Sequence, residues 1–181
     1  DGGSFNTSRA LLASWFTFGS STPGGLQLGA TGNTATISFD SSRTIAGPIS
    51  AYGGYVYVYP STNLISTLAG ASILFKSTGN IVIDPNSKVQ TNNGNITLWA
   101  DANAAGTGWI GMREGVQLNS ANGLTNQANG GGNITLAGGN TTDASGLPTG
   151  YATSPSGTAA WGSNSPSGVQ FGAYVWNANS T

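Results

Sequence analysis

The feature that most restricts the fold of this chain is a short motif in which Gly-Asn precedes an alternating apolar segment. It occurs as Gly79-Asn80-Ile81-Val82-Ile83, Gly94-Asn95-Ile96-Thr97-Leu98 and Gly132-Asn133-Ile134-Thr135-Leu136. Side chains alternate between the two faces of a strand, so the apolar pair of each copy points to one face and the Asn to the other. The motif therefore predicts short strands that follow a tight turn.

The alternation also predicts which side chains are buried. We expect Asn95 and Thr97 to face away from the core, because a shift of one residue would reverse every side chain of the strand. If copies of the motif stack, the repeated Asn residues form a hydrogen-bonded ladder beside a stacked apolar core. The residues expected in one continuous core are Ile81, Ile83, Ile96, Leu98, Ile134 and Leu136.

The predicted fold class is all-β, a parallel β-solenoid with irregular loop insertions. Related segments occur elsewhere, including Gly54-Tyr55-Val56-Tyr57-Val58 and a second family, Gly115-Val116-Gln117-Leu118 and Gly168-Val169-Gln170-Phe171. Their spacing is uneven, which a solenoid tolerates because extra residues leave as loops, here expected at 122–131 and 141–166. An antiparallel β-sandwich is the alternative, since it also uses many short strands.

The composition agrees with an ordered β protein and argues against several classes of function. The chain has 29 Gly, but 38% of its residues are hydrophobic, which is more than a disordered chain contains. Only 6% are charged and the basic residues are scattered, so we expect no binding of nucleic acid. There is no Cys and no His, and no apolar run long enough for membrane insertion.

Part of the chain resembles the repeat regions of filamentous-haemagglutinin-like adhesins, which are very large bacterial surface exoproteins. The resemblance runs from Gly47 to about Leu136, about half of the chain, and rests on AYGG (Ala51 to Gly54), GNITLWAD (Gly94 to Asp101) and GGNITLAGG (Gly131 to Gly139). It implies a right-handed parallel β-helix that is secreted or held at the cell surface and serves adhesion, aggregation or scaffolding.

We expect residues 1–181 to form a single solenoid module. Residues 46–136 match the repeat pattern best. Residues 1–45 match it poorly and are expected to be a cap or an inter-subunit segment, and residues 137–181 a loop-rich end with a final strand.

Carboxylates are the remaining route to catalysis, because some β-helical proteins cleave polysaccharides with paired acids. No two of the six acids are close in sequence, although Asp84 and Asp101 follow equivalent strands and would be the pair to meet across neighbouring coils. We interpret them as turn residues, and Arg113 with Glu114 as a surface ion pair. The chain is therefore predicted to have no catalytic residues and not to be an enzyme.

No metal or cofactor is expected either. Oxygen ligands lie near glycine turns at Asp101-Ala102-Asn103 and between Gly138 and Asp143, but neither segment matches a calcium-binding loop. Turns in which an Asp or Asn side chain accepts backbone hydrogen bonds explain these residues more simply.

Aromatic side chains provide the strongest surface signal. If Val56 and Val58 point inward, Tyr55, Tyr57 and Tyr59 form an outward stripe, and such stripes bind sugars or partner surfaces unless a loop or the N-terminal segment covers them. The five Trp residues, Trp109 among them, remain open between core and interface.

Three function classes follow. The first is an adhesive or spacer module whose partners are carbohydrate, a host or cell surface, or neighbouring repeats. The second is a self-associating fibre or sheath subunit, and the third a polysaccharide-acting enzyme, which the missing His and sparse acids disfavour. The assembly candidates are Trp15, Phe16, Phe18, Phe171, Tyr174 and Trp176, and the candidate glycosylation sites are Asn6, Asn140 and Asn179.

Overall fold

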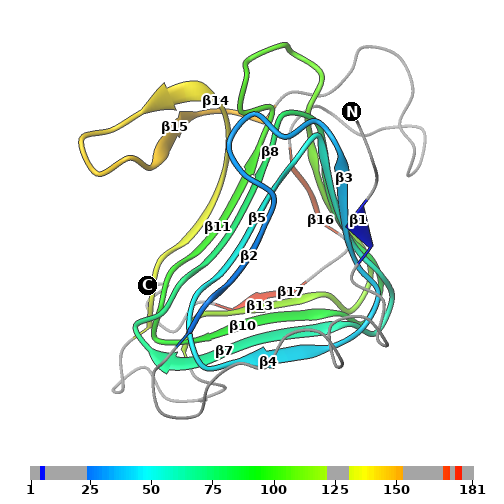
Figure 1. The fold of residues 1–181 in the computed structure, drawn as a ribbon, viewed down its shortest axis with the longest axis vertical. Helices are drawn as coiled ribbons and strands as arrows, with labels where there is room; N and C mark the ends of the chain where they lie inside the picture. The colour runs from blue at the N-terminus through cyan, green and yellow to red at the C-terminus, as the bar shows by residue number, and fades with distance from the viewer. Residues whose placement is uncertain (1–4, 7–23, 122–130, 153–168, 172–173, 177–181) are drawn as a thin grey trace.

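Three sheets of stacked strands make up the computed structural model, which describes residues 5–6, 24–121, 131–152, 169–171 and 174–176. In Figure 1 the sheets form the three sides of a triangle around a common interior. The chain passes from one sheet to the next and then returns to the first, and we call each such passage a coil. Helix is absent from the described residues.

We name the sheets A, B and C. In the order of their strands, sheet A contains β1 (Phe5–Asn6), β3 (Thr36–Phe39), β6 (Tyr55–Val58), β9 (Ile81–Ile83), β12 (Ile110–Met112) and β16 (Val169–Phe171). Sheet B contains β2 (Leu26–Leu28), β5 (Ile49–Gly53), β8 (Ile73–Ser77), β11 (Ile96–Ala100), β14 (Ile134–Thr142) and β15 (Pro148–Gly150). Sheet C contains β4 (Arg43–Ile45), β7 (Asn63–Ala69), β10 (Lys88–Asn92), β13 (Gln117–Asn119) and β17 (Tyr174–Trp176).

Strand pairing is parallel throughout the described sheets, with the single exception of β14 and β15. Apart from β14 and β15, consecutive strands lie in different sheets, and the parallel pairs join strands of successive coils. This all-β arrangement of stacked parallel strands is consistent with a β-solenoid and excludes the antiparallel sandwich, in which neighbouring strands run in opposite directions.

The register explains why the Gly-Asn motif recurs at uneven intervals. The copy at Gly79 opens β9 in sheet A, whereas the copies at Gly94 and Gly132 open β11 and β14 in sheet B. The motif therefore marks two corners of the coil. The second family is divided in the same way, since Gln117-Leu118 belongs to sheet C and Gln170-Phe171 to sheet A.

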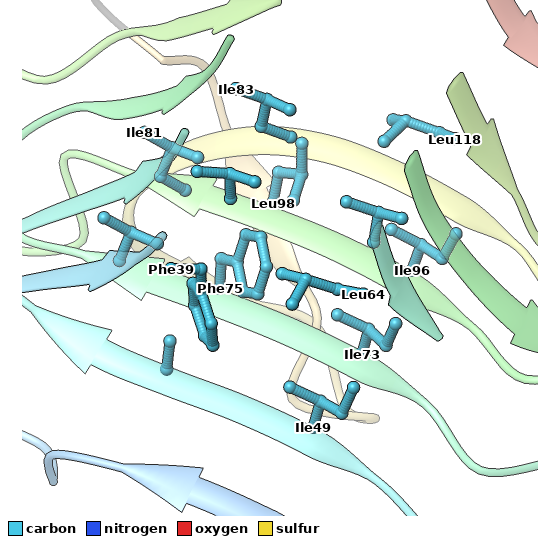
Figure 2. Close-up of a cluster of buried hydrophobic side chains, with 14 of the residues drawn as sticks. Phe39, Ile49, Leu64, Ile73, Phe75, Ile81, Ile83, Ile96, Leu98 and Leu118 are labelled. Carbon is cyan, nitrogen blue, oxygen red and sulfur yellow. The ribbon is translucent and has the colours of Figure 1, made fainter. Parts of the chain in front are cut away.

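The interior is filled by one apolar side chain above another. Ile49, Ile73, Ile96 and Ile134 occupy one register column of sheet B, and the first three are fully buried. Figure 2 shows side chains from all three sheets meeting in this cluster, and Phe39 stacks on Phe75 with ring centroids 5.5 Å apart. Packing of this kind, rather than intrinsic propensity, selects the register of the sheets.

Most of the predicted core is confirmed, but its last pair is not. Ile81, Ile83, Ile96 and Leu98 are fully buried, whereas Ile134 and Leu136 are only partly buried against the core. These two residues lie in β14, the last strand on this side of sheet B that continues the parallel stack. Side chains of β14 stack on those of the parallel strand β11, but no described strand pairs in parallel with β14 on its opposite edge.

Thr97 lies on the outer face as the alternation predicted, and the polar side of the motif shows two further features. The Oδ1 atom of Asn95 accepts a hydrogen bond from the backbone of Asn133 at 2.8 Å, so the Asn side chains bridge coils through backbone groups. Thr97 alternates with the inward Ile96 and Leu98 and thus lies on the outer face, yet it is buried. The outer face of sheet B is consequently packed over at this point.

The segments that connect sheet B to sheet A differ in length. Those that lead into β3 and β12 are long, and those that lead into β6 and β9 are short. The predicted loop at 141–166 contains strand β15, which folds back on β14 as an antiparallel hairpin that leaves the triangle in Figure 1. Strands β2 to β4 lie within the predicted cap at 1–45 and continue the same three sheets.

Candidate binding surface

The three tyrosines of strand β6 and its end lie on the outer face of sheet A. Val56 and Val58 are fully buried, so the alternation turns Tyr55, Tyr57 and Tyr59 outward, as the sequence predicted. Tyr55 and Tyr57 stack with ring centroids 5.9 Å apart, and Tyr57 meets Tyr59 edge to face at 4.7 Å. We call these residues the tyrosine stripe. Tyr59 is 41% exposed, and the other two are half-buried.

Two charged residues from the next two coils fix this stripe. The Tyr57 hydroxyl donates a hydrogen bond to Oδ2 of Asp84, and Nε of Arg113 lies 3.0 Å from Oδ1 of the same carboxylate. The ladder places them there, because the Asp84 amide donates to Val58 and the Arg113 amide to Ile83. Arg113 therefore pairs with Asp84 across the sheet, a partner that the expected pairing with its neighbour Glu114 did not anticipate.

The ion pair between Asp84 and Arg113 is partly buried, and the carboxylate is the more deeply buried partner. The Asp84 side chain is 3% exposed and that of Arg113 is 35% exposed. A buried carboxylate is tolerated when it is hydrogen-bonded and paired, and here a phenol and a guanidinium share its two oxygens.

The same environment suppresses ionisation of the tyrosines. Burial, followed by the hydrogen bond to Asp84 and the charge of Asp84, raises the pKa of Tyr57 to about 12. Burial is also the main cause that raises the pKa of Tyr55, with Asp84 contributing and Arg113 opposing. Both rings thus stay neutral at physiological pH and offer an apolar face with a hydroxyl rim.

Trp109 extends the aromatic surface beside the stripe. A Cβ at Gly111 would lie 2.2 Å from Cζ3 of Trp109, so the indole ring covers the outer face of this glycine. Gly111 is in register with Val82 and through it with Tyr57. The sequence did not decide whether Trp109 belongs to the core or to an interface. The outward glycine two residues later, Gly111, indicates an outward ring, because it leaves space for the indole to lie against the strand.

The acids that the sequence singled out lie apart from one another. Asp84 follows a strand of sheet A, whereas Asp101 follows a strand of sheet B and is 1% exposed. Both carboxylate oxygens of Asp101 lie 3.1 Å from the amide of Gly106. Asp143 accepts hydrogen bonds from Ser145 and Leu147, and these bonds, that of the Ser145 hydroxyl first, lower its pKa.

Asp101 and Asp143 therefore act as acceptors in turns, the role that the sequence suggested for them. Across the part of the chain with described positions, no three His, Cys, Asp or Glu side chains gather as a metal site would require.

The other candidate residues are placed only in part. Phe171 lies in β16, and Tyr174 and Trp176 lie in β17, while Trp15, Phe16 and Phe18 fall outside the described residues. Of the candidate glycosylation sites, Asn6 lies in β1, Asn140 is exposed in β14, and Asn179 falls outside the described residues.

Comparisons with family models, with curated proteins and with solved structures gave no match to this chain. Among the described residues there is no helix of the length and hydropathy needed to cross a membrane.

Proposed function

We propose that this chain is a non-catalytic adhesive module of a large bacterial surface protein, built as a right-handed parallel β-helix and located outside the cell. The observation that carries the proposal is the tyrosine stripe on sheet A, which is held by Asp84 and Arg113 from the two following coils. The resemblance of residues 47–136 to filamentous-haemagglutinin-like repeats supports it.

The chemistry of the stripe suits carbohydrate. A sugar ring presents apolar C–H groups on its faces and hydroxyls at its edge, and a tyrosine offers a flat apolar face with a polar rim. The stripe is preorganised, because Tyr57 is anchored through its hydroxyl and the three rings contact one another. Little side-chain freedom is lost on binding, which favours affinity.

Binding of purified protein to an array of polysaccharides and host-cell glycans tests this proposal. We expect Tyr59→Ala to weaken binding at least tenfold, because Tyr59 is the most exposed ring of the stripe. Tyr151→Ala is the matched control, since Tyr151 is 88% exposed in the segment that follows β15. Equal binding by wild type and Tyr59→Ala would contradict the assignment of the stripe.

Absence of catalysis is part of the same proposal. The carboxylate nearest to the stripe, Asp84, is buried and neutralised by Arg113, which leaves it poorly placed to exchange protons with a bound sugar. We expect no release of reducing sugar or of unsaturated product from the polysaccharides that bind. Activity that is lost in Asp84→Asn or Asp101→Asn would contradict this.

A self-assembling fibre subunit is the second candidate, favoured by strand edges that no other described strand pairs with. Strand β2 in sheet B and strand β4 in sheet C each pair with a single described strand. Such edges are templates for pairing with a further copy. Electron microscopy of native material tests it: ordered filaments that Val175→Lys, in β17, abolishes would support assembly, and dispersed particles would count against it.

A further inference from the structure

The corner between sheets B and A holds a pocket of about 240 Å³. It arises from the uneven corner lengths: long connections in the first and fourth coils flank short ones in the second and third. The two long loops form walls, and the ends of β5 and β8 form the floor. In Figure 1 these loops rise where the two sheets meet at the top of the triangle. The lining residues used below are Asn33, Tyr52, Lys76, Thr78 and Asn103.

Hydrogen bonds hold both walls in place. In the first, Nδ2 of Asn33 donates to the Tyr52 carbonyl at 2.8 Å, and Gly29, at a φ of 72°, lies so close to that carbonyl that a Cβ would be 2.1 Å from it. In the second, the loop is organised by Asp101, whose buried carboxylate accepts from Gly106. The cavity is thus largely formed in advance of any ligand.

One charge dominates the lining. Lys76 lies on the outer face of β8, in register with Tyr52 and Trp99, and its Nζ atom is 3.6 Å from the centroid of the Trp99 ring. Trp99 is itself fixed, because its Nε1 donates to the Gly139 carbonyl at 2.6 Å. The indole attracts the ammonium but does not neutralise it.

Lys76 is therefore a partly desolvated cation in the lining of a pocket whose other lining residues are neutral. None of the described acids is within ion-pair distance of it, and Asp101, the acid next to the pocket residue Ala102, is occupied with Gly106. Burial lowers the pKa of Lys76, because desolvation disfavours its charged form. A bound anion would offset that desolvation.

The remaining lining residues indicate which uncharged groups the bound anion carries. Thr78 offers a hydroxyl, and the amide groups of Asn33 and Asn103 each keep hydrogen-bonding capacity beside the bonds that they make within their own loops. The rest of the lining is mainly apolar, which suits the C–H groups of a sugar ring, and the volume suits one small ring rather than a larger molecule. We propose that this pocket binds a single carboxylated sugar unit of the uronic-acid class, with its carboxylate on Lys76. The pocket uses none of the tyrosines of the stripe.

Titration of the wild-type protein with sodium glucuronate, followed by NMR of the backbone amides, tests the proposal. We expect saturable shifts in the loops at 29–33 and 101–106, with a Kd of about a millimolar, as is typical of a ligand this small. Acetate carries the negative charge without the sugar hydroxyls, and glucose carries the hydroxyls without the charge. Both should bind at least tenfold more weakly than glucuronate. Equal binding of acetate or glucose would overturn the proposal.

Amino-acid substitutions test whether glucuronate binds at Lys76 in this pocket. Lys76→Gln should weaken glucuronate binding at least tenfold, while Lys88→Gln, on sheet C, should leave it unchanged. Asn103→Ala alters an exposed wall residue, so it keeps the fold and should weaken binding severalfold even if Lys76→Gln proves unstable. Unchanged binding in a folded Lys76→Gln or in Asn103→Ala would overturn the assignment. Loss of glycan binding in Tyr59→Ala with glucuronate binding intact would separate this site from the stripe.

Discussion

The hydroxyl of Tyr57 and the carboxylate of Asp84 are hydrogen-bonded across neighbouring strands of sheet A, and Arg113 completes the group from the following strand. Because the three residues come from three successive coils, each contact depends on correct stacking of the coils. The tyrosine stripe and the stability of the stack are therefore coupled through one buried carboxylate.

The first prediction concerns the ionisation of Tyr57. With a pKa of about 12, this phenol should ionise after ordinary tyrosines in a rapid pH-jump titration followed by absorbance of tyrosinate. Tyr57→Phe should reduce the amplitude of the late phase and leave the contribution of Tyr55, whose pKa is also raised. Tyr151→Phe should remove only signal from the ordinary range, since Tyr151 is 88% exposed. A late phase of unchanged amplitude in Tyr57→Phe would contradict the assignment.

The same shift predicts how stability depends on pH. The unfolded chain loses the Tyr57 proton near pH 10, whereas the folded protein keeps it until about 12. Between these values the folded state binds more protons, so the free energy of unfolding should be intact below pH 10 and fall as the pH rises to 12. Urea unfolding at several pH values should show a smaller fall over this range in Tyr57→Phe than in wild type.

The second prediction concerns the ion pair. Arg113→Gln leaves the Asp84 carboxylate buried without its cation, which should lower the free energy of unfolding by about 1–3 kcal/mol. Adding Asp84→Asn removes the isolated charge and should restore part of that loss. A double-mutant cycle by urea unfolding measures the coupling, and strictly additive effects would show that the pair contributes nothing.

The third prediction concerns the glycine that opens the repeated motif. A Cβ at Gly94 would lie 2.0 Å from the Ala71 carbonyl oxygen of the preceding coil, so Gly94→Ala forces the coils apart and should cost about 1–3 kcal/mol or more. Gly24→Ala is the control, because no atom of the described residues, apart from its chain neighbours, lies within 4 Å of the added Cβ. Thermal unfolding of the two variants makes the comparison. Similar melting temperatures would contradict close stacking at this corner.

Much of the strand layout could be predicted from the sequence, because alternation is a local signal. The inward positions of Val56, Val58, Ile96 and Leu98 followed from period two alone. Tyr57 was placed on the outer face for the same reason, but its partner Asp84 is separated from it by a whole coil. Finding that partner requires the register between coils, which the uneven spacing of the motifs concealed.

The pocket could not be foreseen for a similar reason. It depends on which corner loops are long, and the loops that carry Asn33 and Asn103 become neighbours only when the coils stack. The exposure of Ile134 is also a property of position, since it shares its motif with the fully buried Ile96 and differs only in lying at the end of the parallel stack.

That difference gives the last prediction. Ile96→Ala removes a fully buried side chain with stacking partners on both sides, Ile73 and Ile134, and should lower the free energy of unfolding by about 2–5 kcal/mol. Ile134→Ala is the same change in the same column, but its side chain is partly exposed, so less apolar area returns to water and a smaller cavity is left. We expect it to cost less than half as much in urea unfolding. Equal losses would mean that Ile134 is as deeply packed as Ile96, with a covering layer that the described strands do not supply.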